Sequence, residues 1–226
     1  MCAGFFVTGT DTGVGKTFVS CLLLKALAKQ RKTVAGMKPI AAGRENGQWL
    51  DVELLRAASN VDIDTALINP YALDSPIAPH IAARQQAIEI NLEKINKAFQ
   101  EISTKADYVV VEGVGGFLVP VNECQDTSDL ARLLNLPVIL VVGMRLGCIN
   151  HALLTMRAIQ HTGFSPAGWV ANCIDPDFLV LDENIDTLKR RLACPLLGIV
   201  PFDAESDSCE LSRLIDVSVL LKDRNV

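Results

Sequence analysis

The residues with the clearest chemistry lie near the start of the chain, where the apolar run Phe5–Thr8 leads into Gly9–Thr17, which reads GTDTGVGKT. Backbone N–H groups, an ammonium and a hydroxyl in this order can hold the phosphates of a nucleoside triphosphate together with Mg²⁺. The loop has one residue more than the general G-x-x-x-x-G-K-[ST] motif, because Gly9 lies six positions before Gly15. A helical pattern follows over 17–29. This order predicts a nucleotide site; the alternative is an ordinary glycine-rich turn with a surface lysine.

Two carboxylates are candidate metal ligands beside this loop. Glu112 ends the apolar run 108–111, and an acid at a strand end near a phosphate loop is the usual position for holding Mg²⁺. The plainer interpretation is an acid that merely faces water. Asp51 is a weaker candidate from spacing alone, because it could equally cap a helix beginning at Val52.

Lys38 is a candidate for stabilising the charge of a transferring phosphoryl group. It follows the run 34–37 and precedes Pro39, so the chain there is extended. Its alternative is a solvated surface lysine. The glycines after Glu112 (Gly113, Gly115 and Gly116) either admit a ligand close to the backbone or form a tight turn.

Composition excludes several classes of function. Half of the 226 residues are hydrophobic and the net charge is −5, which argues against nucleic acid as the main partner. We expect no membrane span, because no apolar stretch approaches about 20 residues, and no secretory signal. Seven scattered cysteines without a C-x-x-C motif indicate reduced thiols in a cytoplasm. The three histidines lack metal-ligand spacing, so we assign none of them to catalysis.

Short β-type runs alternate with helical patterns along the chain. The predicted strands are 5–8, 34–38, 108–112, 138–142, 168–171 and 196–200, and the predicted helices lie near 17–29, 91–104, 127–135, 149–162 and 182–192. This alternation predicts an α/β fold with a mostly parallel sheet and right-handed crossovers. The carboxyl ends of the strands should then converge on the ligand.

The motifs together resemble the dethiobiotin synthetases. The resemblance covers essentially the whole chain and rests on the segments 9–17, 36–39, 111–116, 141–151, 168–172 and 195–201. The extra residue in the phosphate loop is itself the spacing of this family. The resemblance implies one domain over residues 1–226 with a three-layer P-loop NTPase fold. It also implies ATP- and Mg²⁺-dependent carboxylation and ring closure of 7,8-diaminopelargonic acid with CO2, a step of biotin synthesis, without a biotin prosthetic group.

The resemblance also implies roles for individual residues. The implied catalytic residues are Thr12, Lys16 and Lys38, and the implied Mg²⁺ ligands are Thr17, Asp51 and Glu112. The implied ATP contacts are Gly13, Val14, Gly15, Lys16, Thr17, Phe18, Glu112, Gly115, Asn172, Pro201, Phe202 and Asp203. The implied contacts to the diamine are Ala42, Gly116, Leu146, Gly147, Cys148 and Asn150.

The segment Gly147–Asn150 and Ala42 carry further expectations. The helix that begins near Gly147–Asn150 offers N–H groups suited to a carboxylate. In the family this segment reaches across a two-fold interface, which implies a homodimer; the residues alone fit a helix start without ligand equally well. Many members have a hydroxyl residue where this chain has Ala42. One neutral hydrogen bond is worth about 0.5–1.5 kcal/mol, so we expect a severalfold weaker affinity for the diamine.

Two other functions compete with this interpretation. One is a nucleotide-driven switch of the partitioning and division-site type, but such ATPases typically add a lysine near the start of the loop, where this chain has Thr10-Asp11-Thr12. The other is an ATP-dependent ligase or amidase of the cobyrinate type, which usually carries a glutaminase domain for which 226 residues leave no room. The joint motifs favour the synthetase.

Overall fold

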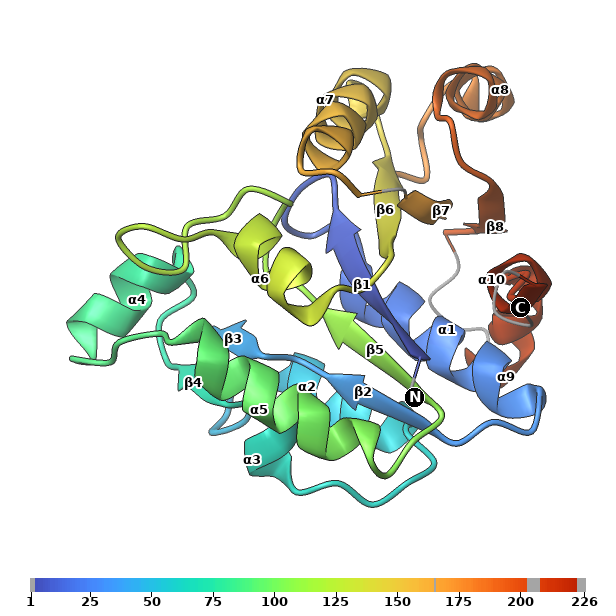
Figure 1. The fold of residues 1–226 in the computed structure, drawn as a ribbon. Helices are drawn as coiled ribbons and strands as arrows, with labels where there is room; N and C mark the ends of the chain where they lie inside the picture. Colours follow the sequence, from blue (N-terminus) through green and yellow to red (C-terminus); the bar gives the residue numbers. More distant parts are fainter. Residues whose placement is uncertain (1–2, 165, 203–207, 223–226) are drawn as a thin grey trace.

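A six-stranded sheet forms the centre of the computed structural model, which describes residues 3–164, 166–202 and 208–222 (Figure 1). The strand order is β2-β5-β1-β6-β7-β8, and within the described residues every pairing of this sheet is parallel. The strands are β1 (Ala3–Gly9), β2 (Val34–Met37), β5 (Tyr108–Glu112), β6 (Val138–Met144), β7 (Pro166–Cys173) and β8 (Leu196–Val200). The predicted strands and parallel sheet are therefore confirmed, with β1, β6 and β7 longer than expected.

The long helices also agree with the sequence pattern. Both ends of each of the five predicted helices lie within one residue of the observed bounds. These helices are α1 (Lys16–Lys29), α5 (Leu92–Ser103), α6 (Thr127–Leu134), α7 (Cys148–His161) and α8 (Leu181–Arg191). Further short helices are α2 (Leu50–Ala58), α3 (Thr65–Ile68), α4 (Pro79–Gln85), α9 (Ser208–Leu211), the 3-10 turn η1 (Ser212–Leu214) and α10 (Ser218–Lys222). In the described part of the chain, no helix is both long and apolar enough to span a membrane.

The central sheet is buried on both faces, because its apolar strands alternate their side chains between two hydrophobic clusters. Phe6, Val109 and Leu140 join the cluster covered by helices α5 to α8. Their neighbours Phe5 and Val110 join the cluster on the opposite face, which α1 and the C-terminal helices cover. Helices on both faces of a parallel sheet make the three-layer arrangement visible in Figure 1.

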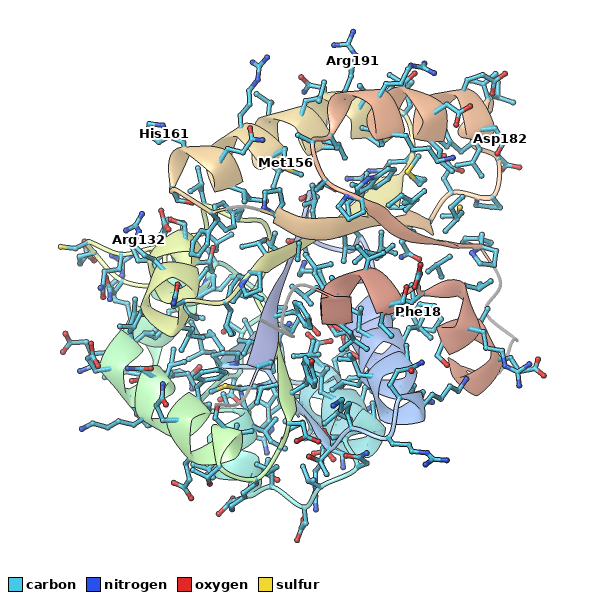
Figure 2. All side chains as sticks on the ribbon, turned by 45° about the vertical axis from the view of Figure 1, so that its right-hand side comes forward. Phe18, Arg132, Met156, His161, Asp182 and Arg191 are labelled. Carbon is cyan, nitrogen blue, oxygen red and sulfur yellow. The ribbon has the colours of Figure 1, made fainter. Side chains whose placement is uncertain are left out.

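Helix α8 lies beside α7 on the outside of the sheet (Figure 2). Figure 2 shows Asp182 and Arg191 at opposite ends of α8. Acidic residues occupy the first turn of this helix and basic residues the last, as the helix dipole favours. Because its exposed face is charged, α8 forms the outer layer here, and its buried Ile185 and Leu188 connect it to the core.

A second, two-stranded parallel sheet starts where β2 ends. Its strands are β3 (Ile40–Ala42) and β4 (Tyr71–Leu73). Lys38 stands at the change from one sheet to the other: its N–H donates to the carbonyl of Ile68 at 2.9 Å, and the carbonyl of Pro39 accepts from Tyr71 at 3.1 Å. The buried side chain of Asn69 donates to the Lys38 carbonyl at 2.6 Å. These bonds fix the Lys38 backbone at the carboxyl edge of the sheet.

Candidate active site

The loops that follow β1, β5 and β6 meet at the carboxyl edge of the central sheet. Strand β1 lies between β5 and β6, so the chain leaves it at a topological switch point, where α/β sheets bind ligands. The N–H of Thr10 donates to the carbonyl of Val141 at 3.0 Å, and that of Gly113 to the carbonyl of Val7 at 2.9 Å. Hydrogen bonds to the sheet therefore hold the start of the loops that follow β1 and β5.

Gly15 allows the phosphate loop to turn against β7. Its φ of +83° lies in the left-handed region, and a Cβ there would come within 2.1 Å of the Asn172 side-chain nitrogen. Asn172 is buried and donates to the carbonyl of Val14 at 2.9 Å. The structure thus brings Asn172, which the family resemblance associated with ATP binding, against the phosphate-loop segment 13–17.

Thr17, Asp51 and Glu112 converge on one point. The Thr17 hydroxyl lies 2.9 Å from a carboxylate oxygen of Asp51 and 2.9 Å from Oε1 of Glu112. Asp51 is the second residue of α2, whose N-cap residue is Trp49, so the alternative role of Asp51 as a helix cap does not apply. The three candidate Mg²⁺ ligands, drawn from three separate segments of the chain, are neighbours.

The chemistry of this oxygen cluster fits a hard cation. Glu112 is only 1% exposed, and its second oxygen, Oε2, is buried without a hydrogen-bond partner among the described residues. A buried carboxylate oxygen is costly unless a donor or a cation faces it. Mg²⁺ prefers oxygen ligands and commonly binds through one or two carboxylates plus substrate phosphates. Thr17, Asp51 and Glu112 would therefore hold Mg²⁺ together with the phosphates of a nucleotide.

Lys38 is part of the same cluster and is not the solvated surface lysine of the alternative interpretation. Its side chain is 4% exposed, and its Nζ lies 2.5 Å from Glu112 Oε1 and 2.9 Å from Asp51 Oδ2. Burial lowers the pKa of Lys38, but the two carboxylates outweigh this effect and hold the pKa above its usual value. Burial also acts to raise the pKa of Asp51, and Lys38 overcomes it, so that this pKa is lowered. Lys38 and Asp51 are therefore both charged at neutral pH.

Lys16 extends over the phosphate loop and donates from Nζ to the carbonyl of Asp11 at 3.1 Å. It is buried, and this burial together with the nearby charge of Lys38 lowers its pKa to about 8. An anion placed between the two ammonium groups would relieve their mutual repulsion. Their arrangement therefore suits a bound phosphate.

An ion pair that sequence reasoning missed joins the phosphate loop to the segment before α7. Asp11 accepts from Arg145 at 2.6 Å through one carboxylate oxygen and from the N–H of Thr12 at 2.7 Å through the other. Both partners stand in motifs of the sequence, but no local pattern can pair residues that lie 134 positions apart. Because both side chains are roughly half exposed, the pair positions the loop more than it stabilises the fold.

Ala42 borders a cavity of about 180 Å³ that reaches Asp51. The cavity lies between the small sheet and the start of α2 and is lined by Ala41, Ala42, Gly43, Glu45, Trp49, Leu50, Asp51 and Pro76. Gly115 and Gly116 lie farther along the same edge: a Cβ on Gly115 would be 3.6 Å from the Thr12 hydroxyl, and one on Gly116 would be 3.7 Å from the Gly9 carbonyl. Of the predicted diamine contacts, Ala42 therefore shares a cavity with the candidate metal ligand Asp51, and Gly116 adjoins the phosphate loop.

The other predicted diamine contacts lie at the start of α7. Leu146 is 91% exposed, and Gly147, with φ +93°, precedes the helix without any side-chain cap. Asn150 is exposed, whereas the Cys148 side chain is buried and its N–H donates to the carbonyl of Arg145 at 3.0 Å. Burial raises the pKa of the Cys148 thiol. Substrate contacts at these four positions remain predictions.

The remaining predicted nucleotide contacts differ in their surroundings. Pro201 and Phe202 are exposed and follow β8, whose Val200 pairs with Asn172, so they lie near that residue. Phe18 borders a separate, largely apolar cavity of about 320 Å³ between α1 and α2, and its contact with ATP remains a prediction. Asp203 lies outside the described residues.

Comparison with known proteins agrees with this geometry. A family model described as "AAA domain" matches residues 3–209. The chain is 60% identical over 215 residues to an ATP-dependent dethiobiotin synthetase of Nitrosospira multiformis, covering 95% of both chains. The chain belongs to the dethiobiotin synthetase family. A dethiobiotin synthetase of Aromatoleum aromaticum is 53% identical over 92% of this chain and 94% of its own length.

Solved structures that resemble this dethiobiotin synthetase family member confirm its fold. A ParA family ATPase from Chlorobium tepidum superposes with a TM-score of 0.59 over 98% of this chain and all of that one, at 14% identity. MinD from Pyrococcus horikoshii, complexed with Mg-ADP, superposes with a TM-score of 0.58 over 97% of this chain and 89% of its own, at 15% sequence identity. At such low identity these likenesses show the P-loop NTPase fold alone.

Proposed function

We propose that this chain closes the ureido ring of dethiobiotin from 7,8-diaminopelargonic acid, CO2 and ATP, with Mg²⁺. The observation that carries the proposal is the meeting of Lys16 and Lys38 with the oxygen cluster of Thr17, Asp51 and Glu112. The family relatives, named dethiobiotin synthetases, support the substrate assignment and favour it over a switch ATPase. The proposed setting is the cytoplasm.

The reaction needs positioned charges and no protein nucleophile. An amine of the substrate attacks CO2 and loses a proton, giving a carbamate. A carbamate oxygen attacks the γ-phosphorus of ATP and ADP leaves; the second amine then attacks the carbamoyl carbon and phosphate leaves. Bound Mg²⁺ would supply charge neutralisation at the phosphates. Lys16 would hold the γ-phosphate, and Lys38 would stabilise the carbamate and the transferring phosphoryl group.

The diamine would lie along the same edge of the sheet. Its amines would approach Lys38 from the cavity that joins Ala42 to Asp51. Its carboxylate tail suits the uncapped start of α7 at Gly147–Asn150. We propose, from the family resemblance, that this segment serves the site of a second copy, which makes the working enzyme a homodimer.

The direct test measures ATP hydrolysis by the purified protein while each substrate is omitted in turn. We expect phosphate release only when the diamine and bicarbonate are both present, with a cyclic urea detected by mass spectrometry in equal amount. ATP turnover at the same rate without the diamine, or turnover driven by DNA or lipid vesicles, would contradict the proposal and favour a switch ATPase.

Ala42→Ser should tighten binding of the diamine. The new hydroxyl would face the cavity next to Asp51 and add one hydrogen bond, worth about 0.5–1.5 kcal/mol. We expect the KM for the diamine to fall severalfold, with kcat and the KM for ATP nearly unchanged. Steady-state kinetics with Ala42→Val as a control for size checks this, since valine adds volume without a donor. An equal change in both variants would show that Ala42 acts only through packing.

A further inference from the structure

The metal site contains a cation of the protein itself. Lys38 Nζ contacts one oxygen of each candidate metal-binding carboxylate, at 2.5 Å from Glu112 Oε1 and 2.9 Å from Asp51 Oδ2. The Thr17 hydroxyl contacts the same Glu112 oxygen and the other Asp51 oxygen, both at 2.9 Å. The ammonium thus lies where two carboxylates, one of them almost fully buried, need a positive charge.

A metal ion and the ammonium would compete for these oxygens. Both are cations, and Glu112 Oε1 accepts from the ammonium and the Thr17 hydroxyl at once. A divalent ion bound to Glu112 and Asp51 would repel Lys38 at close range in a site that excludes most water. Lys38 has another partner beside it, the Gly113 carbonyl at 3.3 Å, and its side chain ends near the Asp51 edge of the diamine cavity.

We propose that Lys38 is the counter-cation of the metal-free site and that Mg²⁺ displaces its ammonium from Glu112 toward the reacting groups. The inference rests on the proposed function, because it concerns the same lysine and the same ligands. Metal binding then has two consequences. It neutralises the carboxylates, and it releases the lysine that the carbamate and γ-phosphate require. Without metal, the carboxylates hold this lysine, and the protein cannot use it on an incomplete complex.

The alternative is a fixed ion pair that persists when metal binds. The two possibilities differ in what removal of the ammonium does to metal affinity. If the ammonium competes with the metal, its removal tightens metal binding. If the ion pair is purely structural, its loss disorders Asp51 and Glu112 and weakens metal binding.

The experiment titrates Mn²⁺, a paramagnetic substitute for Mg²⁺, into the nucleotide-free protein at one fixed pH and follows free Mn²⁺ by electron paramagnetic resonance. We expect Lys38→Met to bind Mn²⁺ at least about tenfold more tightly than the wild type. Lys189→Met is the matched control, because it removes the same charge from a lysine that pairs with Asp186 at the surface of α8. Lys38→Arg keeps a cation at the site and should bind no more tightly than the wild type.

Equal or weaker Mn²⁺ binding by a folded Lys38→Met would overturn the inference, as would an equal gain in Lys189→Met. If Lys38→Met unfolds without metal, because the two carboxylates then repel each other, Mn²⁺ should refold it. A circular dichroism spectrum that remains that of an unfolded chain at saturating Mn²⁺ would contradict the proposal. Failure of the proposed function appears separately, as absent diamine-dependent ATP turnover in the wild type. The Mn²⁺ comparison does not depend on that turnover.

Discussion

Lys38→Ala is expected to lower turnover at least about 100-fold without weakening ATP binding. The ammonium is buried beside Glu112 and Asp51, and under the proposed function it would face the place where the transferring phosphoryl group and the carbamate gain charge. Removing one positioned group that stabilises transition-state charge typically costs about 100- to 1,000-fold in kcat. Nucleotide binding depends mainly on the phosphate loop and Lys16, which the substitution leaves in place.

Single-turnover phosphate release and calorimetric titration with an ATP analogue separate these two effects. Lys189→Ala provides the control, since it removes an equal charge from the surface pair with Asp186. A fall in ATP affinity without a fall in the rate of the chemical step would mean that Lys38 serves nucleotide binding instead, and its proposed role would be wrong.

The central sheet could be predicted from the sequence because its signals are local. Buried parallel strands appear as apolar runs such as 108–112, and the amphipathic helices between them repeat with helical spacing, so both kinds of element were placed to within a few residues. The small sheet of β3 and β4 was not predicted. Each strand has only three residues, too few for a local pattern, and the side chain of Asn69 holds the two chain segments together at Lys38.

The candidate site could be predicted in part for a related reason. Lys38 and Glu112 stand at the ends of apolar strands, and the carboxyl ends of parallel strands share one edge of the sheet. The pairing of Asp11 with Arg145 had no such signal, because it depends on how two loops leave neighbouring strands. The direct contact between Lys38 and Asp51, a candidate metal ligand, was likewise invisible in the sequence. It depends on the three-dimensional position of α2, which brings Asp51 to the strand ends.

Gly15→Ala is expected to weaken ATP binding at least about 100-fold and to lower the free energy of unfolding by about 2–3 kcal/mol. The left-handed φ of +83° strains any residue with a Cβ by about 1–2 kcal/mol. The new methyl group would also lie within 2.1 Å of the Asn172 side-chain nitrogen and break its bond to Val14, worth about 1 kcal/mol. Displacing the loop N–H groups removes charge-assisted hydrogen bonds to the phosphates, and two of them at about 1.5 kcal/mol each account for the loss of affinity.

Gly163→Ala separates backbone strain from the clash. Gly163 has a similar φ of +86°, but its Cβ would meet no atom within 4 Å, so this variant carries the strain alone and should bind ATP normally. Urea unfolding and calorimetric ATP titration compare the two variants. Adding Asn172→Ala to Gly15→Ala removes the clashing group, so the stability losses of the double variant should be less than additive. Additive losses, or a Gly15→Ala variant no worse than Gly163→Ala, would show that the loop does not depend on close packing against Asn172.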